Sequence, residues 1–196
     1  MDISPNSSPT PTSLRRNRFD VSGRSVLVVG ATGALGAAGA RALAEEGAVL
    51  TLTGSSTDAL EALAQELRPL TRVTTVPRRP DTPEDASAMV AAACADGPLW
   101  GVLVAAGINK TAPIVDMPVD TFEQVMDANV RGSWLVAQAA GRAWLDQGTG
   151  GSLVLVSSTR GRLGHPAGYT AYCPSKAAVD LLAKTLAAEW GSAGIR

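Results

Sequence analysis

Short apolar runs alternate along the chain with longer stretches in which apolar residues recur at helical spacing. Glycine, proline or serine bounds most of the short runs, as expected for strands buried on both faces of a sheet. This alternation predicts an α/β fold with three α/β/α layers, in which helices cover both faces of a doubly wound parallel sheet. We expect strands at 25–29, 48–53, 72–76, 101–107 and 152–156, and helices from the first glycine turn to about 46 and at 58–67, 83–95, 119–146 and 172–190.

The beginning of the chain differs from this pattern. Residues 1–18 are rich in serine, proline and threonine and have almost no apolar side chains, so they cannot bury enough surface to fold. We expect a disordered tail there and one domain over 19–196. The 196 residues, of which 45% are hydrophobic and 18% charged, suit a single well-buried domain.

The composition argues against several classes of function. The formal net charge is −1, which gives no reason to expect nucleic acid or an anionic membrane as a partner. The two cysteines, Cys94 and Cys173, and the single histidine, His165, are too few for a disulfide framework or a metal site. No apolar run approaches the ~20 residues of a membrane span, and the first residues lack the apolar core of a secretion signal. We therefore expect a cytoplasmic protein without bound metal.

A glycine-rich turn follows the first expected strand at once. Residues 25–36 read SVLVVGATGALG, in which Gly30 allows a sharp turn while Gly33 and Ala34 leave room for a phosphate. Gly36 allows the next helix to pack closely on the strand. A strand, a glycine turn and a helix in this order predict a site for the pyrophosphate of a dinucleotide at the helix N-terminus.

A tyrosine and a lysine lie four residues apart at the end of residues 157–176, which read SSTRGRLGHPAGYTAYCPSK. On a helix this spacing places Tyr172 and Lys176 on one face. Since a helix tolerates Pro174 only in its first turn, the helix should begin at or just before Tyr172. A neighbouring ammonium favours the tyrosinate, and lowering a tyrosine pKa by about 3 units takes roughly 4 kcal/mol. The pair is a candidate proton-transfer site, although the same spacing also occurs in surface contacts.

Taken together, these motifs resemble the short-chain dehydrogenase/reductase family, from about residue 19 to the last residue. The family's glycine motif matches at Gly30 and Gly36, with Ala34 in place of the middle glycine, and it implies a Rossmann-like fold. The residues that match the family's active-site tetrad are Asn129, Ser158, Tyr172 and Lys176.

The resemblance implies an NAD(P)-dependent oxidoreductase that interconverts a secondary alcohol and a ketone. Tyr172 would transfer the proton, Ser158 would hydrogen-bond the substrate oxygen, and Lys176 would lower the tyrosine pKa and hold the nicotinamide ribose. Asn129 would hold a kinked helical turn and a water. The cofactor-binding residues that follow from the match are Gly30, Thr32, Gly33, Ala34, Leu35, Gly36, Gly54, Ser55, Ser56, Ala106, Gly107, Tyr172 and Lys176.

The turn after the second expected strand bears on the choice of cofactor. An Asp or Glu at this point would bind the ribose hydroxyls and repel a 2′-phosphate, but residues 54–57 read GSST. The sequence thus favours NADP over NAD, with NAD still possible. In the simpler interpretation, Ser56 or Thr57 caps the helix that follows.

Three further positions depart from the family pattern. Arg79 occupies the place of an Asp that contacts adenine, and Val104 and Ala105 replace two asparagines that brace the sheet. The chain also ends where the family begins its sixth strand, so we expect a sheet truncated there, with a bare edge on strand 152–156. These departures keep a second hypothesis open, that of a non-catalytic nucleotide-binding or scaffold protein.

The expected partners are a small alcohol or ketone substrate and further copies of the chain. In the loop before Tyr172, the side chains of Arg160, Arg162, His165 and Tyr169 are candidates to face substrate, and the simpler interpretation is a solvent-exposed loop. By the resemblance, helices 119–146 and 172–190 pair across a homodimer or homotetramer interface.

Overall fold

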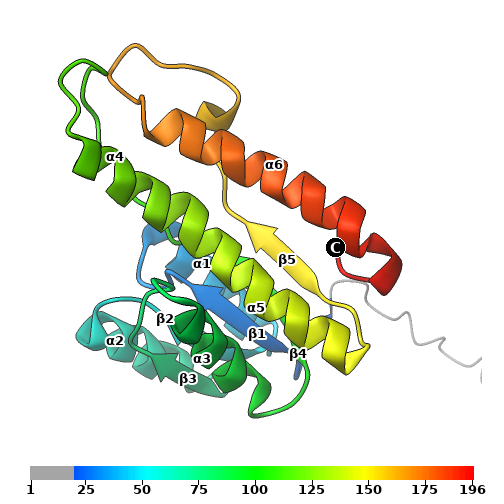
Figure 1. Cartoon of the computed structure of the whole chain (residues 1–196). Coiled ribbons are helices and arrows are strands. Elements are labelled where there is room, and N and C mark those ends of the chain that lie inside the picture. The colour runs from blue at the N-terminus through cyan, green and yellow to red at the C-terminus, as the bar shows by residue number, and fades with distance from the viewer. Residues whose placement is uncertain (1–19) are drawn as a thin grey trace, which may run out of the picture.

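Five parallel strands form one sheet in the computed structural model, which describes residues 20–196 (Figure 1). The strand order β3-β2-β1-β4-β5 is that of the Rossmann fold, and the predicted doubly wound α/β fold is confirmed. The predicted tail at 1–18 lies outside the described residues. The strands are β1 Ser25–Val29, β2 Val49–Thr53, β3 Val73–Val76, β4 Leu99–Val104 and β5 Ser152–Leu155.

Helices lie between successive strands, and local chemistry sets where several of them begin and end. Gly47, with φ of +76°, follows α1, and the Ser56 side chain caps α2. Thr82 and Asp85 form a reciprocal capping box at the start of α3. The helices are α1 Ala34–Glu45, α2 Thr57–Leu67, α3 Pro83–Cys94, α4 Val119–Met126, α5 Gly132–Gln147 and α6 Tyr172–Trp190.

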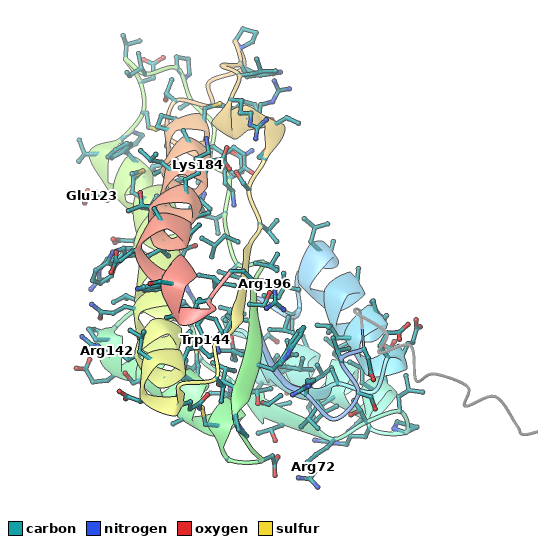
Figure 2. The ribbon with its side chains drawn as sticks, turned by 90° about the vertical axis from the view of Figure 1, so that its right-hand side faces the viewer. Arg72, Glu123, Arg142, Trp144, Lys184 and Arg196 are labelled. Carbon is teal, nitrogen blue, oxygen red and sulfur yellow. The ribbon has the colours of Figure 1, made fainter. Side chains whose placement is uncertain are left out.

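Successive side chains along each strand point to opposite faces of the sheet, and this divides the core into two layers. Val26 and Val28 pack with residues of α1 and α2, whereas Leu27 and Val29 pack with residues of α3 and α5 on the other face. In both views α6 runs beside α5 (Figures 1 and 2). The predicted three-layer arrangement follows from this division.

A buried tryptophan fixes α5 against the sheet. Trp144 is 1% exposed, and its indole N–H donates to the carbonyl of Leu99 at 3.0 Å. A Cβ on Gly151 would lie 2.1 Å from the indole ring, so only glycine fits there. Arg142, two residues earlier, points away from the molecule (Figure 2). This contact fixes the C-terminal part of α5, and Asn129 lies just before the N-terminus of the same helix.

The prediction for the fourth strand was wrong at both ends. The strand begins at Leu99 rather than 101 and stops at Val104 rather than 107. The Ala105 N–H still donates to the Val29 carbonyl at 2.8 Å, but the next residues leave the sheet and cross the end of β1. Small apolar residues such as Ala106 and Gly107 resemble the end of a buried strand in sequence, although here they serve to let the backbone pass close to Gly30.

The predicted helix 119–146 contains a π-helical segment, Asp127–Arg131, between α4 and α5. Asn129 lies in this segment and is fully buried. A π-helical turn holds one residue more than an α-helical turn, which widens the backbone locally and often marks a functional site. The expectation of a kinked turn at Asn129 is confirmed in this form.

The last two residues pair with the first half of β5. The Leu153 N–H donates to the Arg196 carbonyl at 2.8 Å, and the Arg196 N–H donates to the Gly151 carbonyl at 3.0 Å. The Arg196 guanidinium also lies 5.5 Å from the centre of the Trp100 ring, beside the sheet (Figure 2). The expectation of a bare edge along β5 was therefore wrong for this half. Val154, further along, is 52% exposed.

Candidate active site

A cavity of about 220 Å³ opens at the carboxyl ends of β1 and β4. At this point the strand order reverses, and open parallel sheets bind their ligands at such switch points. The segments that follow β1, β2, β3 and β4 line the cavity, together with the beginning of the π-helical segment. The cavity therefore draws its wall from parts of the chain that are distant in sequence.

The glycine turn after β1 brings backbone to the surface of the cavity. Gly30 has φ of +79°, a conformation that favours glycine, and a Cβ there would lie 2.6 Å from the backbone of Ala106. A Cβ on Gly36 would lie 2.1 Å from the Gly30 carbonyl oxygen. The turn is held by the Thr53 carbonyl, which accepts from the N–H groups of Gly30 and Ala31 at 3.0 and 2.9 Å. The turn can hold this path only with glycine at both positions.

The N-terminus of α1 differs from those of α2 and α3. Gly33 is its N-cap, no side chain caps it, and its first turn has no acidic residue. Serine and threonine side chains satisfy the corresponding amides of α2 and α3. Free N–H groups and the positive end of a helix dipole attract an anion, and Gly33 also lines the cavity. These features fit the pyrophosphate of a dinucleotide.

Seven of the thirteen predicted cofactor-binding residues line the cavity, and six do not: Ala34, Leu35, Gly36, Ser56, Tyr172 and Lys176. Leu35 is 64% exposed, Ala34 is also exposed, and Gly36 lies behind the turn against Gly30. The Ser56 hydroxyl accepts from the Ala59 N–H at 3.3 Å, so the alternative interpretation as a helix cap is confirmed. Those that line the cavity are Gly30, Thr32, Gly33, Gly54, Ser55, Ala106 and Gly107.

The segment after β3 contributes charged residues that the sequence-based set left out. The Arg78 guanidinium donates to Asp85 at 2.6 Å and, with Thr82, lowers the pKa of that carboxyl. Arg79, in the place of the family's adenine-binding Asp, lies 3.4 Å from Asp81. The signal was available, since the segment follows the carboxyl end of a parallel strand as the other lining segments do. The lining residues absent from the predicted set include Arg78, Arg79, Pro80, Asp81, Ile108, Asp127 and Ala128.

Asn129 joins the π-helical segment to the chain that follows β4. Its amide oxygen accepts from the Ile108 N–H at 2.7 Å, and its amide nitrogen donates to the Ile108 carbonyl at 2.9 Å. The same nitrogen donates to the Ser175 hydroxyl at 2.9 Å, and that hydroxyl donates to the Tyr172 carbonyl at 2.7 Å. One buried amide thus holds the cavity wall and the start of α6 together.

Lys176 lies at the meeting point of these elements. Its side chain is buried, and its ammonium donates to the Val156 carbonyl at 2.9 Å. A Cβ on Gly107 would lie 3.4 Å from the ammonium nitrogen, which places the lysine at the end of the cavity. Burial lowers the pKa of Lys176, partly opposed by Asp180. The side chain meets no carboxylate closely enough to form an ion pair within residues 20–196.

Tyr172 and the turn that Ser158 caps both lie near Lys176. The Tyr172 ring centre lies 5.8 Å from the Lys176 ammonium, as the shared helix face predicts. Ser158 follows β5 and accepts from the Arg160 N–H at 3.2 Å, capping a short 3₁₀ turn, Thr159–Gly161. That turn packs on α6, because a Cβ on Gly161 would lie 2.9 Å from the Lys176 backbone carbon.

The sequence model of the family described as short chain dehydrogenase matches residues 24–196 of this chain. The chain belongs to the short chain dehydrogenase family. An uncharacterized oxidoreductase of Mycobacterium tuberculosis is 58% identical over 180 residues, covering 91% of this chain and 66% of the relative. A glucose 1-dehydrogenase of Gluconobacter oxydans is 34% identical over 184 residues, covering 92% and 68%. The chain thus spans 66% of the length of the M. tuberculosis relative.

Solved structures of short chain dehydrogenases show the same fold. A short-chain type dehydrogenase/reductase from Mycobacterium marinum superposes with a TM-score of 0.88 at 34% identity, covering 91% of this chain and 73% of that one. An NAD⁺-bound xylitol dehydrogenase gives a TM-score of 0.85 at 30% identity, covering 90% and 68%. These likenesses establish an oxidoreductase family and a Rossmann-like fold.

Unlike the usual short chain dehydrogenase, this chain has Val104 and Ala105 in place of an asparagine pair at the end of β4. Backbone hydrogen bonds connect the strands there instead, since the Val156 N–H donates to the Val104 carbonyl at 2.9 Å. The Val104 side chain is 2% exposed and packs in the core. The ends of the three central strands are therefore aligned without the polar side chains that the family usually places there.

Two further properties concern the described residues as a whole. None of the helices within residues 20–196 combines the length and the apolar character needed to cross a membrane. The same residues hold no group of three or more His, Cys, Asp or Glu side chains arranged to bind a metal ion.

Proposed function

We propose that this chain carries the active site of an NAD(P)-dependent oxidoreductase that interconverts a secondary alcohol and a ketone. The observation that carries the proposal is the position of Lys176, buried beside Gly107 of the cavity wall and 5.8 Å from the centre of the Tyr172 ring. Relatives named as dehydrogenases of glucose, D-threitol and galactitol support the reaction class. The substrates in these names are polyhydroxylated compounds.

Tyr172 is the proposed general acid and base. In the oxidation direction, the O–H bond of the alcohol breaks and its proton passes to the tyrosine oxygen. When bound, the nicotinamide cofactor supplies the hydride acceptor, which takes the hydrogen and the electron pair of the carbinol C–H bond. Ser158 holds the substrate oxygen by a hydrogen bond, and its position after β5 places it at the same edge of the sheet as the cavity.

Lys176 and Asn129 support this proton transfer. The ammonium of Lys176 favours the tyrosinate electrostatically, and little water screens a buried charge. Asn129 keeps the π-helical segment attached to Ile108, which fixes the wall against which the lysine lies. These are roles for the chain's own side chains, whichever cofactor binds.

We further propose NADP as the preferred cofactor. The cavity wall has no carboxylate in the turn after β2, where Gly54 and Ser55 line it, and Arg78 and Arg79 line it beyond β3. Guanidinium groups bind phosphates well, and the side chains of both arginines are about half exposed. A 2′-phosphate would therefore meet no acid in the turn after β2, and it would compete with Asp85 and Asp81 for the guanidinium groups of Arg78 and Arg79.

We also propose a homodimer or homotetramer built on α4, α5 and α6. Large apolar side chains are exposed on these helices, including Trp134 at 47%, Leu145 at 51% and Leu181 at 64%. A hollow of about 280 Å³ between α5 and α6 is lined by Trp134, Leu145 and Trp190 among others. Apolar surface of this kind on two adjacent helices suits a second copy of the same pair.

The proposed function is tested with Tyr172→Phe. We expect kcat on sugars, polyols and sugar acids to fall by at least about 10², while the Kd for NADP(H) changes by less than about threefold. The reduced nicotinamide gives both readouts, by absorbance for rates and by fluorescence for binding. Cys173→Ala, the adjacent residue on α6, is the matched control and should keep the wild-type rate. A Tyr172→Phe enzyme with the wild-type kcat would refute the assignment.

A further inference from the structure

Arg160 is held next to the proposed catalytic residues by its backbone. Its N–H donates to the Ser158 hydroxyl at 3.2 Å, in the first turn after β5. The next residue, Gly161, packs so closely on α6 that a Cβ there would lie 2.9 Å from the backbone of Lys176. Arg160 therefore lies in a turn that contacts both the Ser158 side chain and α6, the helix that carries Lys176.

The side chain of Arg160 is also directed by aromatic contacts. Its guanidinium carbon lies 6.0 Å from the centre of the Tyr169 ring, within the range of a cation–π contact. The Tyr169 ring meets the Tyr172 ring edge-on, with 6.0 Å between centres, and His165 meets Tyr169 at 4.8 Å. The Tyr169 ring thus contacts both the guanidinium of Arg160 and the ring of Tyr172.

The positive charge of Arg160 has no partner within residues 20–196. Its guanidinium forms no ion pair and no hydrogen bond there, although six other arginines in the described residues lie within 4.0 Å of a carboxylate. It differs from its neighbour Arg162, which is 81% exposed and lies 4.0 Å from Asp180. Arg160 is partly buried, and burial of a guanidinium without an acceptor costs free energy.

One carboxylate lies beside the turn that carries Arg160: an Asp180 oxygen would lie 3.0 Å from a Cβ on Gly161 and is 4.0 Å from the Arg162 guanidinium. Residues 148–179 contain no Asp or Glu, whereas the chain as a whole has a net charge of −1. A bridge between Ala112 and Tyr169 joins this loop to the segment 107–115, which contains Lys110 and again no acid. In these two segments and at Asp180 the positive side chains, including Arg160, Arg162 and Lys110, therefore outnumber the carboxylates.

We propose that the substrate is a carboxylate, of the hydroxy-acid or sugar-acid class, and that Arg160 binds its carboxylate group. This inference rests on the proposed function, since the reacting oxygen is assigned to Tyr172 and Ser158. The planar guanidinium offers two parallel donors to a carboxylate, a geometry that a lysine cannot reproduce. Because Arg160 and Tyr172 are linked through contacts of 6.0 Å each with the Tyr169 ring, the proposed substrate carries its carboxylate several carbon atoms from the reacting carbinol.

Matched pairs of acids and neutral alcohols test this inference. Gluconate is compared with glucitol and arabinonate with arabinitol, by titration calorimetry on the protein saturated with NADP⁺ and by initial rates. We expect at least one acid to bind at least tenfold more tightly than its alcohol, which corresponds to about 1.4 kcal/mol. Arg160→Gln should remove that preference, and Arg160→Lys should restore only part of it. Arg162→Gln is the matched control and should keep the preference.

The outcomes separate this inference from the proposed function. Loss of hydride transfer with a retained acid preference would refute the redox assignment alone, because calorimetry needs no turnover. Equal binding of acid and alcohol in both pairs, including no binding of either, would refute the role of Arg160. An Arg160→Gln protein that melts at the wild-type temperature and still prefers the acid would refute it as well.

Discussion

Replacement of Asn129 by alanine removes the polar connection at the centre of the site. The wild-type amide makes three hydrogen bonds, two to the backbone of Ile108 and one to the Ser175 hydroxyl, at 2.7 to 2.9 Å. Alanine would leave the N–H and the carbonyl of Ile108 without these partners in a partly buried place. Ser175 would keep its bond to the Tyr172 carbonyl.

The magnitude of this change follows from the two orphaned backbone groups. Each buried group left unsatisfied costs about 1–3 kcal/mol, whereas the better helix propensity of alanine returns less than about 0.7 kcal/mol. We therefore expect Asn129→Ala to lower the free energy of unfolding by about 2–5 kcal/mol. Ser175→Ala leaves both bonds to Ile108 intact and should cost only about 1 kcal/mol.

Urea denaturation followed by circular dichroism, at one protein concentration and with the slope m compared, measures both variants. Hydrogen exchange of the Ile108 amide supplies a local readout, because loss of its acceptor should speed exchange there more than in the strands. The reasoning fails if Asn129→Ala costs less than about 0.5 kcal/mol, or if Ser175→Ala costs as much as Asn129→Ala.

Four further predictions concern the cofactor, the assembly, the lysine and the glycine turn. Ser55→Asp should weaken NADP binding relative to NAD by at least tenfold in Kd, about 1.4 kcal/mol, and an unchanged ratio would contradict the proposed NADP preference. Trp134→Glu should lower the mass measured by light scattering to that of a smaller assembly, while Glu45→Lys on α1 should leave the mass unchanged. Burial lowers the pKa of Lys176 in the folded state, so the unfolded state binds more protons between the folded and unfolded pKa values. The free energy of unfolding of the wild type relative to Lys176→Met should therefore rise with pH across that window. Urea titrations at several pH values that show a constant difference would contradict this. Gly36→Ala should cost at least about 2 kcal/mol in urea denaturation and weaken cofactor binding, since its Cβ would lie 2.1 Å from the Gly30 carbonyl oxygen.

The parts of the fold that local rules control could be predicted from the sequence. The bounds of β1 and α6 agree with the prediction, because Gly30 ends an apolar run and Pro174 permits a helix only if it begins near Tyr172. The cap on α2 was likewise predicted as one of two possibilities at Ser56. In each case one or two residues decide the local conformation, and those residues lie within the element itself.

Other features depend on contacts between distant segments and could not be predicted in the same way. Asn129 indicated a special turn, but the π-helical geometry arises from its bonds to Ile108 and Ser175, which lie on other elements. The end of β4 was placed too late because the composition of 105–107 does not reveal that the backbone must cross over Gly30. The position of Arg78 after a parallel strand indicated the edge of the cavity, whereas its hydrogen bond to Asp85 depends on how the loop folds.

The cofactor end and the proton-transfer end of the candidate site are held in place by different contacts. This difference determines how freely the amino-acid sequence can change at each end. At the cofactor end, close backbone contacts at Gly30 and Gly36 exclude any Cβ, so the sequence there has little freedom. At the proton-transfer end, the fixed side chains bind backbone carbonyls, as Asn129 binds that of Ile108 and Lys176 binds that of Val156. A carbonyl is offered by every residue type, so the side chains around these anchors are free to change without loss of the anchors themselves. The loop that carries Arg160 belongs to this second end, which is where a shared catalytic arrangement can be fitted to a substrate of a particular charge.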